Sequence, residues 1–132
     1  MSFDPKSLQY ASTHEWIHME DGPGGKTATV GVSDFAIHAL TDLVHIDLPE
    51  VGRAVQAGKS FGEVESVKAV SDLYSPVDGE VVDVNKSVAQ HLESLTDDPY
   101  GAGWLVKIRV QGSPSGLLDF AAYKKQCDEA EG

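Results

Sequence analysis

The chain has 132 residues, of which 21 are Asp or Glu and 10 are Lys or Arg, so its formal net charge is −11 at pH 7. A chain of this length buries roughly two-thirds of its unfolded surface around one core, which predicts a single domain spanning residues 1–132. The strong negative charge argues against nucleic-acid phosphates and anionic membrane surfaces as partners, because neither is attracted to like charge.

The apolar runs and the single cysteine set further limits. No run approaches the ~20 apolar residues that a membrane-spanning helix needs, and the first ten residues are too polar for a signal peptide. We therefore expect a cytoplasmic protein, or one of an organelle matrix if the chain is processed. Cys127 has no second cysteine with which to form an internal disulfide, and we interpret it as an incidental thiol.

Strand and turn patterns dominate the first third of the chain. Alternation over Thr13–Met19 predicts a strand, and a turn-rich stretch, Glu20–Gly25, should return the chain into a second strand, Thr27–Val32. Ser33 offers an N-cap for a short, mostly apolar helix ending at Leu40. We expect this helix to pack on the sheet.

The middle of the chain predicts three more strands. Leu43–Leu48 alternates and is ended by a Pro- and Gly-containing turn. Gly62–Val67 and Ala69–Tyr74 are rich in Val, Ser and Tyr and lie on either side of Lys68. This arrangement places Lys68 at or near a hairpin tip.

The last third predicts helices around one strand. Val88, Leu92 and Leu95 fall at helical spacing, Trp104–Val110 alternates most clearly, and Leu117–Glu129 can form a terminal helix. Many short strands with turns between them and short helices at the edges predict a small β-rich sandwich or barrel.

Lys68 is a lone amine on an acidic surface. Between Lys59 and Lys86, Lys68 is the only basic residue in the sequence. An exposed lysine often serves only solubility, whereas a lone amine at a hairpin tip is also suited to covalent modification. The acidic residues that surround it are Glu63, Glu65, Asp72, Asp78, Glu80 and Asp83.

The sequence around Lys68 resembles the lipoyl attachment site of the glycine cleavage system H protein. The matching segments are Glu65-Ser66-Val67-Lys68-Ala69, Ser71-Asp72 and Ser75-Pro76-Val77-Asp78-Gly79-Glu80-Val81. Biotin carriers usually flank the lysine with methionines, and lipoyl domains of 2-oxo-acid dehydrogenases usually place an aspartate before it, so Val67 and Ala69 favour the H protein. The likeness covers about residues 8–129 and includes Ser12-Thr13-His14-Glu15-Trp16, Val30-Gly31-Val32-Ser33-Asp34, Leu48-Pro49-Glu50-Val51-Gly52 and Asp98-Pro99-Tyr100-Gly101-Ala102-Gly103-Trp104.

This resemblance implies a lipoyl-carrier domain that is not an enzyme. The fold would be mainly β, a barrel-sandwich hybrid with short helices, one of them at the C-terminus. Lipoate would be amide-linked to Lys68 by a lipoate ligase or lipoyl transferase. The arm would shuttle an aminomethyl group from glycine decarboxylase (P protein) to the tetrahydrofolate-dependent aminomethyltransferase (T protein), and dihydrolipoyl dehydrogenase (L protein) would reoxidise it.

The resemblance also assigns a role to Glu15. In H proteins the loaded arm can fold into a surface cleft, where the glutamate of the Thr/Ser-His-Glu-Trp motif helps to hold the amine. A carboxylate at Glu15 would favour the protonated amine. The alternative is an exposed strand acid that is simply solvated.

The sequence leaves two other functions open, and its histidines raise the question of a metal site. The first helix departs from the family pattern, because it reads Asp34-Phe35-Ala36-Ile37 where the family commonly has Asp-His-Ala-Gln. This departure allows a second hypothesis, an H-like lipoyl carrier that serves lipoate relay or sulfur metabolism. The third hypothesis is an unmodified binding module. His14 and His18 would lie about 13 Å apart on one strand face, too far to bind one ion directly. We therefore expect no metal site.

Overall fold

Two antiparallel sheets and short helices make up the chain. The computed structural model describes residues 3–22, 24–40, 42–112, 114 and 116–131. The strands are β1 (Gln9–Tyr10), β2 (Glu15–Gly22), β3 (Gly25–Val32), β4 (Leu43–Asp47), β5 (Ala54–Val55), β6 (Ser60–Ser66), β7 (Val70–Tyr74), β8 (Gly79–Val84) and β9 (Val106–Val110). The helices are η1 (Pro5–Ser7), α1 (Asp34–Leu40), α2 (Lys86–Gln90), α3 (Glu93–Asp97) and α4 (Phe120–Glu131).

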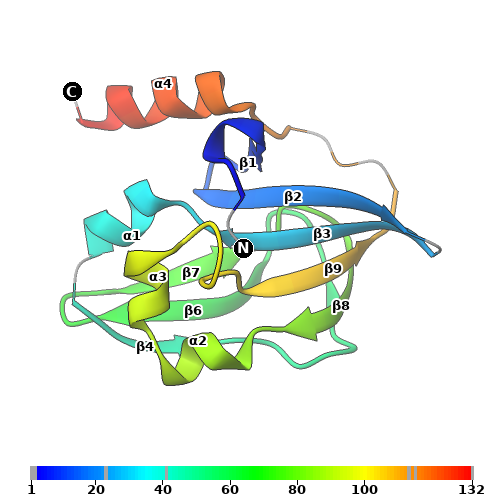
Figure 1. The fold of residues 1–132 in the computed structure, drawn as a ribbon, viewed down its shortest axis with the longest axis horizontal. Helices are drawn as coiled ribbons and strands as arrows, with labels where there is room; N and C mark the ends of the chain where they lie inside the picture. The colour runs from blue at the N-terminus through cyan, green and yellow to red at the C-terminus, as the bar shows by residue number, and fades with distance from the viewer. Residues whose placement is uncertain (1–2, 23, 41, 113, 115, 132) are drawn as a thin grey trace.

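The larger sheet has the strand order β1-β2-β3-β9-β8-β5, and the smaller sheet has the order β4-β6-β7. One apolar cluster contains buried residues from both sheets, which places the main core between their inner faces. Burying these side chains is the main source of stability. Figure 1 shows β7, β6 and β4 of the smaller sheet below β2 and β3 of the larger one. The expected β-rich architecture is present.

The first hairpin is longer than the sequence predicts. Glu20–Gly22 pair with Gly25–Thr27, so most of the expected turn Glu20–Gly25 is strand, and Pro23 lies outside the described residues. Backbone pairing can continue here because the side chains at this end of the ladder are exposed and need no apolar face. At the other end, β2 begins at Glu15 and His14 precedes it, so His14 and His18 do not share a strand.

Two helical expectations also need correction. The apolar spacing of Val88, Leu92 and Leu95 predicts one helical segment, whereas the chain forms α2 and α3 with a break at His91, and both helices bury one side chain in the core. The terminal helix begins at Phe120 and not at Leu117, because the backbone of Leu118 pairs with Tyr10 in both directions at 2.7 Å.

A second apolar cluster lies between α4 and the outer edge of the larger sheet. Figure 1 shows α4 over β1 and β2, on the side away from β4. Its buried members come from both ends of the chain, and they are Leu8, Tyr10, Trp16, Tyr123 and Cys127. The C-terminal helix is therefore packed against the start of β2, next to the His14–Glu15 segment. Among the described residues, no helix is long and apolar enough to cross a membrane.

Candidate lysine hairpin and cleft

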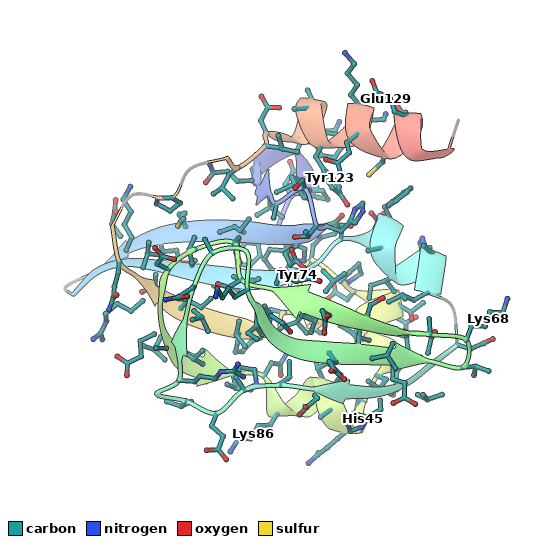
Figure 2. The ribbon with its side chains drawn as sticks, turned by 180° about the vertical axis from the view of Figure 1, so that it is seen from behind. His45, Lys68, Tyr74, Lys86, Tyr123 and Glu129 are labelled. Carbon is teal, nitrogen blue, oxygen red and sulfur yellow. The ribbon has the colours of Figure 1, made fainter. Side chains whose placement is uncertain are left out.

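Lys68 lies in the tight connection between β6 and β7. Glu65 pairs with Val70, and the Ser66 N–H donates to the Ala69 carbonyl at 2.8 Å, so Val67 and Lys68 form the tip. Lys68 is exposed, and Figure 2 shows its side chain projecting away from the sheet. The expected hairpin position of Lys68 is observed.

Side-chain and loop contacts hold this tip closed. The Ser66 hydroxyl accepts a hydrogen bond from the Ala69 N–H at 3.2 Å, and Ser66 itself is buried. The Val67 N–H donates to the Asp42 carbonyl at 3.1 Å, which ties the tip to the segment after α1. The amine is thus presented on a firmly anchored turn.

Exposed apolar side chains gather near the lysine. Val67 and Val70 are 70% and 57% exposed, and Val44 on the neighbouring strand β4 is 48% exposed. The carboxyl groups of Glu63, Glu65 and Asp72 lie on the same hairpin and are also exposed. A partner that reaches Lys68 would therefore meet an apolar tip with acidic sides.

A cleft of about 640 Å³ runs beside β7. The cleft is lined along β7 from Val70, two residues after Lys68, to Tyr74, a length of about 13 Å because a strand rises about 3.3 Å per residue. The opposite wall is one side of α1. The lining residues are Ser12, Thr13, His14, Glu15, Val32, Phe35, Ala36, Ala39, Leu40, Val64, Val70, Ser71, Asp72, Leu73 and Tyr74.

Glu15 is the buried carboxyl group of this cleft. Glu15 is only 2% exposed, so the alternative of an exposed, solvated strand acid does not hold. One carboxylate oxygen accepts a hydrogen bond from the Tyr74 N–H at 3.1 Å, and the other accepts from the Thr13 hydroxyl. These contacts join β2 to β7 across the two sheets.

Burial raises the pKa of Glu15 from 4.5 to about 7, although its hydrogen bonds favour the ionised form. A carboxyl group with this pKa changes charge near neutral pH. A cation placed beside it would be favoured by the ionised form, so the cleft can hold a protonated amine.

The environment of Glu15 includes residues that sequence patterns do not connect. His14 precedes it with φ of 84°, and the His14 ring stacks on Phe35 with centroids 5.4 Å apart. Burial lowers the pKa of His14, which keeps its ring neutral at pH 7. Tyr123, on α4, lies 2.7 Å from the His14 ring nitrogen. Of the contacts around Glu15, the sequence indicated only the motif that contains His14 and Glu15, and not the contacts with Phe35 and Tyr123.

A second hollow of about 690 Å³ lies elsewhere, around Arg53 and the start of β6. In the antiparallel β4–β6 pair, Asp47 and Glu63 mark the end away from Leu43 and Ser66, where the Lys68 tip is anchored. This hollow therefore does not adjoin the lysine.

The family comparisons agree with this geometry. The model of the family described as "Glycine cleavage H-protein" matches residues 8–130. The chain belongs to the glycine cleavage H-protein family. Both the expected family and the expected lipoyl-domain-like barrel-sandwich hybrid are confirmed.

Relatives of the H-protein family match almost the whole chain. The glycine cleavage system H protein of Rhodopirellula baltica is 53% identical over 98% of this chain and 99% of its own length. That of Rubrobacter xylanophilus is 50% identical over 96% of this chain and 97% of its own length. A crystal structure of the H protein from Mycobacterium marinum has a TM-score of 0.84 and 40% identity, covering 93% of this chain and 98% of that one.

Proposed function

We propose that this H-protein family member carries lipoate on Lys68 and serves glycine cleavage as a carrier, without being an enzyme itself. The observation that carries the proposal is the position of Lys68. It is an exposed amine on an anchored hairpin tip, and a cleft with a buried carboxyl group begins two residues away. An amide bond to Lys68 would remove the ammonium charge and lengthen the side chain.

The residues present fit such a modification. The structure shows no ion pair between Lys68 and any residue within the described ranges. The backbone and side-chain bonds of Ser66 fix the direction in which the amine leaves the sheet. When bound, a lipoyl group would supply a disulfide, which is reduced as it accepts the aminomethyl group. The resulting dithiol is reoxidised after the aminomethyl group has been passed on.

The cleft would shelter the loaded arm between partners. To enter it, the arm would run back along β7 past Val70, which lines the cleft. Glu15 would hold the terminal amine, since a buried carboxylate favours a nearby cation more strongly than a solvated one does. Leu40 and Leu73 contribute apolar lining to the same space.

The partners follow from this role. The exposed valine tip with acidic sides would contact a lipoate ligase or lipoyl transferase during attachment. Glycine decarboxylase (P protein), the tetrahydrofolate-dependent aminomethyltransferase (T protein) and dihydrolipoyl dehydrogenase (L protein) would then act on the arm in turn. With a net charge of −11, the chain is suited to partners whose docking surfaces are basic.

The test is a glycine-dependent reduction assay with a bacterial glycine decarboxylase. We expect the lipoylated chain to be reduced when glycine is added, and the Lys68→Arg chain, passed through the same lipoylation step, to give no signal above background. Lys86→Arg is the matched control, because it removes a distant lysine on α2. A lipoylated chain that stays oxidised with glycine would contradict a role in glycine cleavage. It would favour a carrier for another pathway, an alternative that rests on the apolar Phe35 where the family commonly has histidine.

A further inference from the structure

A single hydroxyl group connects the C-terminal helix to two segments next to the cleft, the turn before β2 and the start of α1. We propose that Tyr123, on α4, is a positioning residue: its hydroxyl group bridges His14 and Ser33 and thereby fixes the segments that carry Glu15 and α1. The inference rests on the proposed function, because it assigns this bridge to the cleft that receives the arm.

The bridge is short on both sides. The Tyr123 oxygen lies 2.7 Å from His14 Nδ1 and 2.5 Å from Ser33 Oγ, and these partners are 109 and 90 residues away in sequence. Tyr123 is 4% exposed, and its ring stacks on Tyr10 with centroids 4.3 Å apart. The hydroxyl group is therefore held in place by packing as well as by its partners.

The first partner sets the start of β2. His14 has φ of 84°, a left-handed conformation that costs about 1 kcal/mol or more for a residue with a side chain. Its N–H donates to the Ala11 carbonyl at 2.9 Å, which turns the chain immediately before Glu15. Holding the His14 ring holds this turn, and the turn directs the Glu15 carboxyl group into the cleft.

The second partner sets α1. Ser33 is fully buried, and its hydroxyl accepts from the Ala36 N–H at 3.3 Å, so it caps the helix as the sequence predicts. Phe35, Ala36, Ala39 and Leu40 of this helix line the cleft opposite β7. The Tyr123 hydroxyl thus connects the helix cap to the turn that carries Glu15.

The protons can be placed along this chain of three groups. Because the His14 ring is neutral at pH 7, Nδ1 can accept the Tyr123 proton, and Ser33 can donate its own proton to the Tyr123 oxygen while accepting from Ala36. Tyr123 then donates to His14 and accepts from Ser33, while Ser33 donates to Tyr123 and accepts from the Ala36 N–H. Burial raises the pKa of Tyr123, so its hydroxyl keeps the proton that this arrangement requires.

Tyr10 provides a matched control. Tyr10 is also buried, and its ring stacks on the Tyr123 ring. Its hydroxyl group donates to the Pro5 carbonyl at 2.7 Å. Tyr10 does not line the cleft. Tyr123→Phe and Tyr10→Phe therefore remove the same atom from two packed tyrosines, and only the first removes it from the bridge.

The first experiment titrates the Glu15 carboxyl carbon by NMR in the unmodified chain. In Tyr123→Phe we expect the pKa of Glu15 to fall to about 6 or lower, because the released turn exposes the carboxyl group to water. In Tyr10→Phe we expect it to stay near its wild-type value. A general loss of stability would not produce this difference. Equal pKa values in the two variants would overturn the proposal.

The second experiment measures the loaded carrier. Hydrolysis of the aminomethyl group, which takes up water, releases formaldehyde and ammonia and leaves the thiol on the arm, should be about fivefold faster in lipoylated Tyr123→Phe than in Tyr10→Phe, the effect of one hydrogen bond. Equal rates would contradict the positioning role. If Lys68 is not lipoylated at all, the proposed function fails, while the Glu15 titration still decides whether Tyr123 positions the cleft.

A third probe covers the case in which Tyr123→Phe does not fold. Replacing Tyr123 with 3-fluorotyrosine keeps the ring and hydroxyl but makes the hydroxyl a stronger donor. We expect the His14 Nδ1 resonance to shift, and an unchanged resonance would overturn the bridge.

Discussion

Glu15→Gln is expected to make the protein more stable than the wild type at pH 7.5 and above, by about 3 kcal/mol, and to have little effect at pH 4. The pKa of Glu15 rises from 4.5 to about 7 on folding. One pKa unit corresponds to about 1.4 kcal/mol, so a shift of this size is worth about 3 kcal/mol.

The sign follows from the two protonation states. Below about pH 4.5, Glu15 is protonated in both the folded and unfolded chains and contributes no pH dependence. Between about pH 4.5 and 7, the unfolded chain loses this proton and the folded chain keeps it, so the free energy of unfolding falls as pH rises. Gln is already neutral, and its amide can still accept from the Tyr74 N–H and donate to the Thr13 oxygen.

The measurement is the free energy of unfolding by denaturant at several pH values. The difference between Glu15→Gln and the wild type should grow from pH 4.5 to 7.5 and then level off. Glu65→Gln, an exposed acid on the lysine hairpin, is the control and should change stability by less than about 0.5 kcal/mol at every pH. A difference for Glu15→Gln that does not vary with pH would contradict the buried carboxyl group.

Gly79→Ala is expected to destabilise the protein by about 3 kcal/mol. A Cβ atom at Gly79 would lie 2.1 Å from the Arg109 carbonyl oxygen and 2.7 Å from the Ile108 Cγ2 atom. The first of these is backbone of the neighbouring strand β9, so the strands themselves would have to separate.

The matched control is Gly22→Ala in β2. A Cβ atom there meets only the Gly25 oxygen at 3.5 Å, an ordinary contact, so we expect a change within about 0.5 kcal/mol. Thermal and denaturant unfolding compare the two variants. A Gly79→Ala protein as stable as Gly22→Ala would show that β8 and β9 do not approach as described.

The local parts of the site follow from the sequence. Two short strands flank Lys68, and the hairpin forms between them because its ends pair residue by residue. The Ser33 cap and the start of α1 are equally local, since they depend on hydrogen bonds within three or four residues. Such contacts leave a signal in neighbouring residues.

The burial of Glu15 leaves no such signal. Glu15 and Trp16 are adjacent in β2 and both are buried, because one faces the cleft and Tyr74 while the other packs in the cluster below α4. Acidic side chains are usually solvated, and alternation does not reveal that both faces of β2 are covered at this point. The contact between His14 and Tyr123 joins positions 109 residues apart and depends on the whole fold.

The most direct test of the account is intact mass and peptide mapping after incubation with lipoate, ATP and a lipoate ligase. The wild type should gain one lipoyl group, mapped to Lys68, and Lys86→Arg should gain it equally. Lys68→Arg should gain none. No addition to the wild type, while a known carrier is modified in parallel, or an addition mapped to another lysine, would contradict the assignment of Lys68 as the lipoyl-bearing residue.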